Sequence, residues 1–308
     1  MIYAVRHRTT YAYESEVTFA RCVLRLTPRT SADQSLLSNV VTVTPAPTRE
    51  TIGVGAFGEQ VRSVLVTQPH HRLVIEARSR VDVHAPPIDF TFDTPWESVR
   101  LRSLESTSLE PESPAAFLYP TVRTPVVAPI TDYARESFLA RRPIIEAASE
   151  LMSRIHHDFR YDPGATDVRT PAAVAFEARH GVCQDFAHIM ISSLKGLGLP
   201  AAYVSGYLRT RHSNTDPDLQ GADATHAWVL AWCGKASGWV GFDPTNAVTT
   251  RNDHIVLAIG RDYADVAPID GMLLAPGDQT LEVEVDVAPE NSFAIDFQAK
   301  VGANPGPS

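Results

Sequence analysis

The spacing of apolar residues changes along the chain, and this change constrains the fold more than any other feature of the sequence. From residue 1 to about residue 84, apolar and polar side chains alternate, as in VTFARCVLRL at 17–26 and LVIEARSRVDV at 73–83. A period of two is typical of strands with one buried face. No stretch with a helical period interrupts this region, so residues 1–84 are predicted to form an all-β, sandwich-like domain of antiparallel strands.

The composition changes at residues 85–129, where prolines recur. Proline lacks a backbone N–H and fixes φ, so this segment is predicted to be a connector without regular elements. Aromatic residues within it, among them Phe90, Trp96 and Phe117, make the segment too apolar for a free linker. We therefore expect part of the connector to pack against a domain.

A period of 3.6 follows the connector. Apolar residues between Ile144 and Phe159 would line one face of a helix that begins after Pro143. A second helix is predicted at residues 171–179, and a third helix is predicted from Val182 or Cys183 to Gly198.

Strand patterns return after these helices, at residues 201–209, 225–233 and 238–242, and they are predicted to be neighbours in one antiparallel sheet. Helices followed by a sheet indicate an α+β core, which we place at residues 130–270. An alternating stretch at 281–287 predicts a further strand within a C-terminal segment at 271–301, and residues 302–308 are predicted to be a tail.

The composition excludes several classes of function. Lys and Arg number 27 against 36 Asp and Glu, and no basic block is present, so we expect neither a nucleic-acid partner nor an anionic membrane surface. Neither a signal peptide nor a long apolar run is apparent, which predicts a cytoplasmic protein. The cysteines, Cys22, Cys183 and Cys233, are too few for a disulfide framework. No residue cluster has metal-ligand spacing, so no metal and no cofactor are expected.

Cys183 stands where a thiol becomes reactive, at the predicted start of the third helix. Unpaired backbone N–H groups and the positive end of the helix dipole favour thiolate over thiol at such a position. The alternative is that Cys183 is a small buried hydrophobic residue, as most lone cysteines are.

The residues that follow strengthen the reactive interpretation. His226 lies near the start of one predicted strand, and Asp243 lies at the end of the next. If these strands pair in antiparallel fashion, Asp243 stands beside His226 and can fix the tautomer of the imidazole that serves the thiol. The alternatives are a half-exposed strand histidine and a turn-forming aspartate before Pro244.

Three ordered motifs resemble the bacterial transglutaminase-like superfamily, within the wider papain-like fold. They are GVCQDFAH at 181–188, ATHAWV at 224–229 and GWVGFDPTN at 238–246. The β-rich opening, with RTTYAY at 8–13 and LRLTPR at 24–29, is similar to the N-terminal domain that accompanies this core in one bacterial branch. The resemblance implies a papain-like core of helices on an antiparallel sheet and a triad of Cys183, His226 and Asp243. It leaves the reaction open among transamidation, proteolysis and amide hydrolysis.

These observations predict an enzyme in which Cys183 attacks a carboxamide or peptide carbonyl of a protein or peptide substrate. A thioester forms, and water or an amine resolves it. Backbone N–H groups at the helix start would support the oxyanion, with Gln184 and Tyr161 as candidates for a second donor. Tyr207 and Trp228 are candidates for lining the cleft, with core packing as the alternative. The alternative function is a non-catalytic binding or assembly module of papain-like shape; the oligomeric state is left open.

Overall fold

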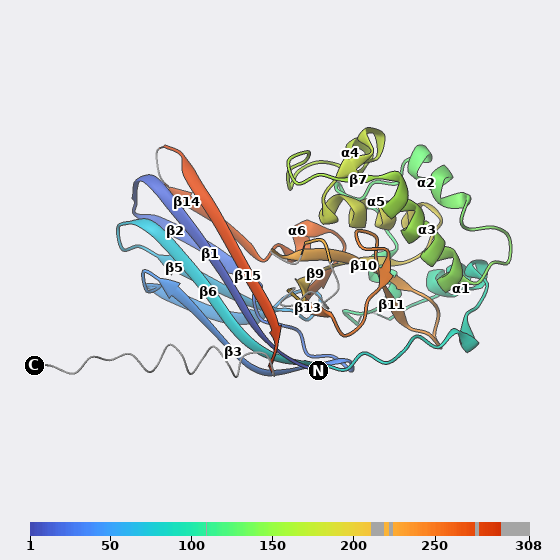
Figure 1. The fold of residues 1–308 in the computed structure, drawn as a ribbon, viewed down its shortest axis with the longest axis horizontal. Helices are drawn as coiled ribbons and strands as arrows, with labels where there is room; N and C mark the ends of the chain where they lie inside the picture. Colours follow the sequence, from blue (N-terminus) through green and yellow to red (C-terminus); the bar gives the residue numbers. More distant parts are fainter. Residues whose placement is uncertain (109, 211–218, 222–223, 275–276, 291–308) are drawn as a thin grey trace, which may run out of the picture.

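The structure is a computed structural model that describes residues 1–108, 110–210, 219–221, 224–274 and 277–290. It consists of a β-sandwich and an α+β core, which lie side by side in Figure 1. The predicted tail at 302–308 lies outside the described residues. Within the described part of the chain, no helix combines the length and the apolar character that crossing a membrane requires.

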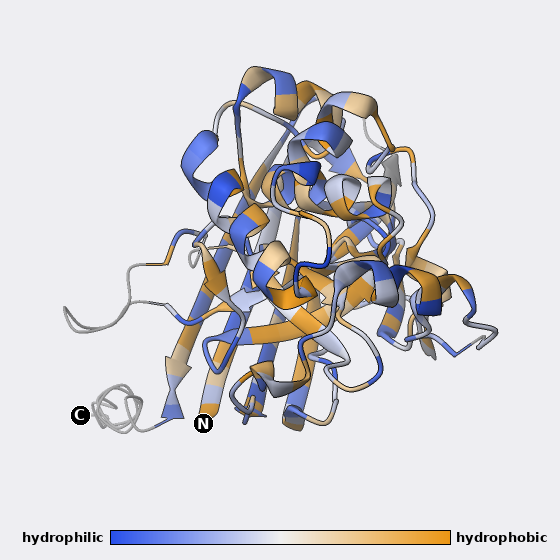
Figure 2. Cartoon of the chain, turned by 90° about the vertical axis from the view of Figure 1, so that its right-hand side faces the viewer, coloured by the Kyte–Doolittle hydropathy of each residue, from blue (hydrophilic) through white to orange (hydrophobic). Residues whose placement is uncertain are grey.

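The sandwich has two four-stranded antiparallel sheets, ordered β15-β1-β6-β3 and β14-β2-β5-β4. Alternation along β1 and β6 buries about one side chain of every two, and Figure 2 shows orange and blue bands along the strands. The strands are β1 (Ile2–Val17), β2 (Phe19–Leu24), β3 (Gln34–Thr44), β4 (Arg49–Val54), β5 (Gln60–Val66), β6 (His70–Val83), β14 (Ile269–Leu274) and β15 (Gln279–Pro289).

Both ends of the chain build this sandwich. β15 pairs with β1 along its whole length, from Tyr3 opposite Pro289 to Tyr13 opposite Gln279, and β14 pairs with β2 in the other sheet. In Figure 1 the red strand β15 therefore runs beside the blue strand β1. The predicted strand at 281–287 is present within β15, and the described part of the C-terminal segment contributes to both sheets. Residues 275–276 and 291–301 of this segment lie outside the described residues.

The connector contains a regular helix, α1 (Trp96–Leu104), which corrects the prediction that prolines would leave none. The helix begins directly after Pro95, and its nine residues contain neither proline nor glycine. Val99 of α1 is 1% exposed and joins the core, and two 3-10 turns, Phe90–Phe92 and Pro114–Phe117, also occur in the connector.

The core is an antiparallel sheet ordered β12-β11-β10-β9-β13, with helices packed on one face. This confirms the predicted sheet of neighbouring strands at 201–209, 225–233 and 238–242. Its elements are α2 (Ala128–Arg135), α3 (Ile144–Asp158), β7 (Arg160–Tyr161), α4 (Ala172–Ala178), β8 (His180–Gly181), α5 (Cys183–Gly196), β9 (Ala201–Leu208), β10 (His226–Trp232), β11 (Trp239–Asp243), β12 (Val248–Thr249), β13 (His254–Gly260) and α6 (Tyr263–Val266).

Helix α5 is the central element of the core. All its residues from Gln184 to Lys195 are buried, because β9 and β10 cover one side of the helix and α2, α3 and α4 cover the other. Ala227, Val229 and Ala231 of β10 belong to the apolar cluster beneath α5. A buried helix with a fixed start gives its first residue, Cys183, a fixed position.

Candidate active site

The start of α5 is fixed by a buried carboxylate. Asp185 accepts hydrogen bonds from the backbone N–H of Val182, at 2.8 Å, and from the hydroxyl of Thr166, at 2.6 Å. It is 1% exposed, and this burial raises the pKa of its carboxyl group. A Cβ at Gly181 would lie 2.6 Å from a carboxylate oxygen of Asp185, so glycine is required where the chain enters the helix. Cys183 is partly exposed at this ordered helix start.

The predicted pairing of the two strands brings the imidazole and the carboxylate together. β10 and β11 are antiparallel, with Val229 opposite Phe242, so the first residue of β10 lies near the last residue of β11. His226 Nε2 donates a hydrogen bond of 2.9 Å to Asp243 Oδ2, and both side chains are fully buried. We call Cys183, His226 and Asp243 the triad.

The environment of His226 favours the imidazolium ion. Burial alone would lower the pKa of His226, but the charge and hydrogen bond of Asp243, and then those of Cys183, outweigh burial and raise this pKa to about 10. The Nδ1 atom is buried and makes no hydrogen bond of standard geometry within the described part of the chain. The thiol of Cys183 still lies near enough to act on the ring, as a thiolate paired with an imidazolium requires.

Asp243 accepts hydrogen bonds from five donors. Oδ1 receives the backbone N–H groups of Thr245, at 3.0 Å, and Asn246, at 3.3 Å. Oδ2 receives His226 at 2.9 Å, the Asn246 side chain at 2.8 Å and His254 Nε2 at 3.2 Å. Burial acts to raise the pKa of the Asp243 carboxyl, yet His226 and His254 hold this pKa well below its usual range. The carboxylate is therefore ionised and fixed in orientation.

Gln184 and Tyr161, the candidates for a second oxyanion donor, both lie close to the helix start. Gln184 follows Cys183 and is 6% exposed, and its Nε2 has no hydrogen-bond partner among the described residues. Tyr161 of β7 pairs with Gly181 of β8, and its ring packs edge-on against Phe186. A buried amide donor without an acceptor is costly unless a ligand supplies one, which favours Gln184 over Tyr161.

Trp228 and Tyr207, the two candidates for lining the cleft, lie in different surroundings. Trp228 is 1% exposed and stacks on His226, with ring centroids 6.1 Å apart, and it also lines the cavity described below. Tyr207 lies between the core sheet and the sandwich, where its hydroxyl is 2.9 Å from Nδ1 of His7 in β1. Both side chains are buried, and a role of either in lining the substrate cleft stays a prediction.

Tyr203 and Tyr263 are two phenols near Cys183 that the motifs did not indicate. Burial raises the pKa of Tyr203 well above its usual value, and the negative charge of Cys183 adds to this. Burial also raises the pKa of Tyr263, and Cys183 contributes there as well. Both phenols are therefore neutral hydrogen-bond donors at ordinary pH.

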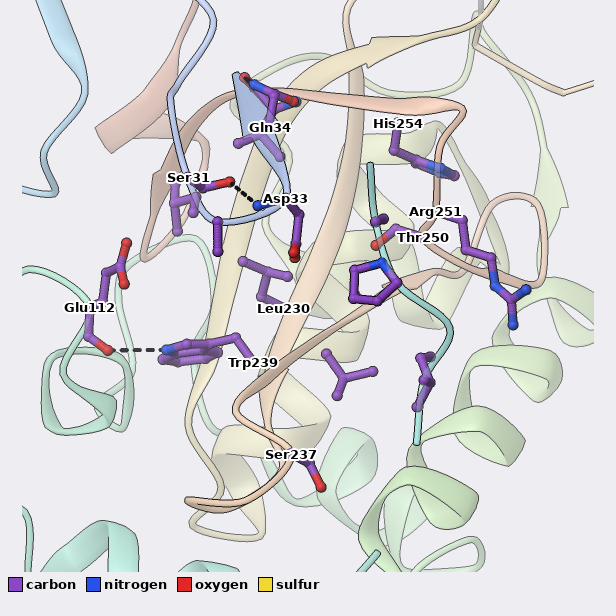
Figure 3. Close-up of a pocket in the computed structure, with 18 of the residues that line it drawn as sticks. Ser31, Asp33, Gln34, Glu112, Leu230, Ser237, Trp239, Thr250, Arg251 and His254 are labelled. Carbon is purple, nitrogen blue, oxygen red and sulfur yellow. Dashed lines mark hydrogen bonds between the residues drawn. The ribbon is translucent and has the colours of Figure 1, made fainter. Parts of the chain in front are cut away.

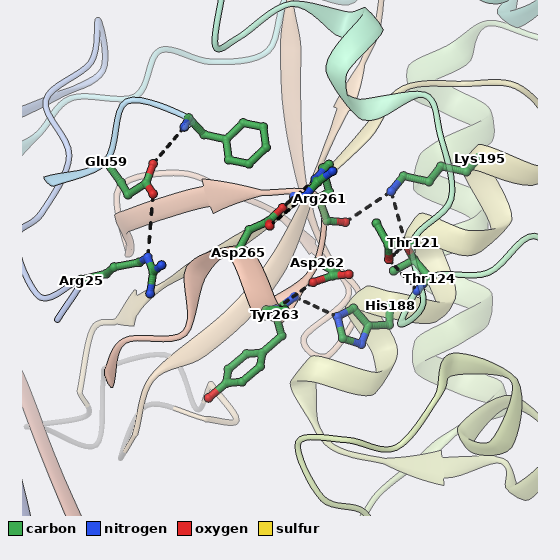
Figure 4. Close-up of polar contacts among 12 residues, drawn as sticks. Arg25, Glu59, Thr121, Thr124, His188, Lys195, Arg261, Asp262, Tyr263 and Asp265 are labelled. Atoms are coloured by element: carbon green, nitrogen blue, oxygen red, sulfur yellow. Dashed lines mark hydrogen bonds and ion pairs between the residues drawn. The ribbon is translucent and has the colours of Figure 1, made fainter. Parts of the chain in front are cut away.

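A polar network anchors the far side of α5 (Figure 4). The buried Lys195 donates to the hydroxyl of Thr124 and to the carbonyl of Arg261, both at 3.3 Å. Nε2 of His188 accepts the backbone N–H of Tyr263 at 3.2 Å, and burial lowers the pKa of His188 to about 3. His188 is thus neutral and structural.

A cavity of about 560 Å³ lies on the face of the sheet away from α5. Figure 3 shows Leu230 and Trp239 of the core facing residues 31–34 of the sandwich across this space. Trp239 Nε1 donates to the backbone carbonyl of Glu112 at 3.0 Å. Cys183 is not among the residues that line the cavity, whereas His254 lines it and also contacts Asp243.

Among the described residues, no group of three or more His, Cys, Asp or Glu side chains is arranged so that it could hold a metal ion.

The contacts that the sequence analysis did not predict are those of Asp185, His254 and Asn246. Asp185 stands at the third position of its helix, where a capping acid is common, so a capping signal could have identified it.

Comparison with known proteins gives matches for both domains. The family described as the transglutaminase-like superfamily matches residues 131–244, and the bacterial transglutaminase-like N-terminal region matches residues 3–82. An uncharacterized protein of Mycobacterium tuberculosis is 38% identical over 301 residues, which is 95% of this chain and 94% of that protein. The protein-glutamine gamma-glutamyltransferase of Pseudomonas aeruginosa is 29% identical over 153 residues, which is 48% of this chain and 22% of that protein.

A solved structure agrees with the fold over nearly the whole chain. It is described as a cysteine protease candidate from Cytophaga hutchinsonii, and it has a TM-score of 0.72 at 22% identity, covering 94% of this chain and 90% of that one. The two domains therefore recur together in another bacterial protein. From the two family matches and the full-length relative, the chain belongs to the transglutaminase-like superfamily and carries the bacterial transglutaminase-like N-terminal region.

Proposed function

We propose that this protein is a cysteine-dependent acyltransferase or hydrolase that acts on amide bonds. The observation that carries the proposal is the pairing of His226 with Asp243 at 2.9 Å, in a setting where Asp243 and Cys183 raise the pKa of the imidazole to about 10. A structural histidine that is fully buried would instead be kept neutral, as His188 is. The raised pKa of His226 suits an imidazolium that stabilises a thiolate.

In the first half of the reaction, the thiolate of Cys183 attacks the carbonyl carbon of the amide. The backbone N–H groups at the start of α5 and the free amide of Gln184 stabilise the negative oxygen. The C–N bond then breaks, and the amine leaves with the proton of His226 Nδ1, so an acyl thioester of Cys183 and a neutral imidazole remain.

In the second half, the acceptor gives its proton to His226 Nδ1 as it attacks the thioester carbon. The C–S bond breaks, and the thiolate and the imidazolium are restored. Water as acceptor gives hydrolysis, and an amine gives transamidation. Asp243 holds the ring so that Nδ1, and not Nε2, exchanges the proton.

We propose a protein or peptide as the acyl donor. The names of two related proteins support this substrate class, since one is a protein-glutamine gamma-glutamyltransferase and the other is described as a cysteine protease candidate. Both activities act on carboxamide or peptide groups of proteins, and both can proceed through the thioester described above.

The direct test is incubation of the protein with casein as glutamine donor and a fluorescent primary amine. Amine incorporation, ammonia release and peptide cleavage are measured together, with Cys183→Ala as control, since this variant removes the nucleophile and little volume. We expect at least one product to form with the wild-type protein and none with the variant. Equal signals from both proteins would reject the enzyme and favour a binding module of papain-like shape.

A further inference from the structure

Asn246 connects the triad to a segment that precedes β10. Its side-chain Nδ2 donates to Asp243 Oδ2 at 2.8 Å and to the backbone carbonyl of Gln220 at 3.3 Å. Its Oδ1 accepts the backbone N–H of Gln220 at 2.8 Å. One amide group therefore satisfies both polar groups of a single backbone residue and, at the same time, one oxygen of the buried carboxylate.

The next residue, Gly221, lies against the imidazole. A Cβ at Gly221 would be 2.6 Å from His226 Nδ1, closer than nonbonded atoms approach, and its φ of +86° is a conformation that favours glycine. Cys183 acts on this same edge of the ring, because Nε2 at the other edge is hydrogen-bonded to Asp243. Gly221 thus borders the space between the thiol and the nitrogen that exchanges protons.

The imidazole is closed off from solvent, and Gly221 is one of the residues packed against it. His226 is 0% exposed although Cys183 is partly exposed, so the thiol can be approached while Nδ1 is covered. In the proposed function an acceptor must reach Nδ1 to lose its proton. The acceptor must therefore fit between Cys183 and the backbone of Gly221.

We propose that Asn246 is a positioning residue that sets the acceptor specificity of this site. It holds Gln220 and Gly221 against His226, so that water or an unbranched primary amine reaches Nδ1 and bulkier acceptors are excluded. The acceptor chemistry rests on the proposed function. The wall itself rests on the contacts of Asn246 and Gly221, and it can be tested without turnover.

The test compares the rates at which Cys183 is alkylated by iodoacetamide and by an iodoacetamide that carries fluorescein. The variants are Asn246→Ala and Asn246→Ser, and serine retains a hydroxyl that can donate to Asp243 but is too short to bond both groups of Gln220. The control is Asn252→Ala, because Asn252 also accepts a backbone N–H, that of Ala85 at 3.1 Å, at an exposed position. Circular dichroism checks that each variant is folded.

We expect the rate with the bulky reagent, relative to the rate with iodoacetamide, to rise about tenfold in the Asn246 variants, because segments whose hydrogen bonds are removed open more often. The ratio should not change in Asn252→Ala. An unchanged ratio in folded Asn246→Ser would overturn the inference, as would an equal rise in the control.

Failure of the proposed function gives a different result. If the wild-type protein releases no product from casein, the acyl-transfer proposal fails, while the alkylation ratio still decides whether Asn246 maintains a wall. If the wild-type protein is active, the rate with a branched amine, relative to the rate with an unbranched amine, should be higher in folded Asn246→Ser than in the wild type. An unchanged ratio would refute the role of Asn246 in acceptor choice.

Discussion

Replacing Asp243 with asparagine tests the electrostatic account of the triad. The substitution retains the shape of the side chain but leaves one oxygen in place of two. In the wild-type protein, Oδ1 accepts hydrogen bonds from the backbone N–H groups of Thr245 and Asn246. Oδ2 accepts hydrogen bonds from His226, His254 and the Asn246 side chain. In either orientation of the side-chain amide, the NH₂ group of the variant therefore faces hydrogen-bond donors.

The two orientations of the new amide differ in their consequences. If the NH₂ group faces the backbone, the N–H groups of Thr245 and Asn246 lose their acceptor, at a cost of about 1–3 kcal/mol each. If the NH₂ group faces His226, the imidazole can accept its hydrogen bond at Nε2, and the ring proton then sits on Nδ1. A neutral ring with its proton on Nδ1 cannot take a proton from the thiol or from the acceptor.

Either orientation removes the charge that most favours the imidazolium. Burial is then opposed only by Cys183, so the pKa of His226 should fall from about 10 towards its ordinary value of 6.5. In a serine triad the same loss of the correct tautomer costs roughly 10⁴ in rate. Since the thiolate itself favours an adjacent imidazolium, we expect a smaller loss, of about 10- to 10³-fold in acyl transfer, for Asp243→Asn.

Histidine-selective NMR titration measures this pKa without a substrate. The signal of His226 is assigned by its absence in His226→Gln, and the wild-type imidazole should remain protonated through pH 8. In Asp243→Asn the same ring should be neutral at pH 8. The reasoning is refuted if folded Asp243→Asn retains an imidazolium at His226 at that pH.

Two further predictions concern stability. Burial lowers the pKa of Lys195 to about 8, so between this value and the ordinary 10.5 the unfolded chain binds more protons and the wild type gains stability as pH rises. Relative to Lys195→Met, this gain should reach up to about 1.4 kcal/mol per pH unit in urea unfolding, and parallel pH dependences of the two proteins would contradict it. Burial lowers the pKa of His188 to about 3, so stability is complete above the unfolded value of 6.5 and is lost as pH falls towards 3. His188→Gln should reduce this acid-dependent loss by up to about 1.4 kcal/mol per pH unit, and an identical acid dependence of both proteins would show that His188 is not neutral in the fold.

Much of the fold could be predicted because its signals are local. Alternation along β1 and β6 and the apolar face of α3 are properties of neighbouring residues, and they indicated the order of a β domain and an α+β core. The pairing of β15 with β1 joins opposite ends of the chain, and alternation does not specify a partner strand. Helix α1 was missed because prolines on both sides of it masked a short helical window.

The triad could also be predicted from local signals, but the contacts that surround it could not. Cys183, His226 and Asp243 stand in short motifs, and the predicted pairing of β10 with β11 suffices to join the last two. His254 reaches Asp243 from β13, a strand the sequence did not suggest. The position of Tyr207 was not predictable from alternation, because every residue of its strand is buried and neither face is marked as solvent-facing.

One partner of Asn246 lies outside the motif in which Asn246 stands. Asp243, its partner three residues away, belongs to the quoted stretch GWVGFDPTN, whereas Gln220 lies in a different part of the chain. Such contacts depend on the tertiary packing of segments that are distant in the sequence, and no local pattern predicts them. They are the contacts on which the proposed acceptor specificity depends.

The most direct test of the account compares the three cysteines within one sample. The protein is treated with limiting iodoacetamide at pH 6, and labelling of Cys22, Cys183 and Cys233 is measured by mass spectrometry of the digest. Burial raises the pKa of Cys22 to about 11 and that of Cys233 further, so both are protonated thiols at pH 6. If His226 and Asp243 hold Cys183 as a thiolate, it should react at least about 100-fold faster than either of the others, and this advantage should disappear in His226→Ala. Equal, slow labelling of all three in the folded wild-type protein would contradict the central claim.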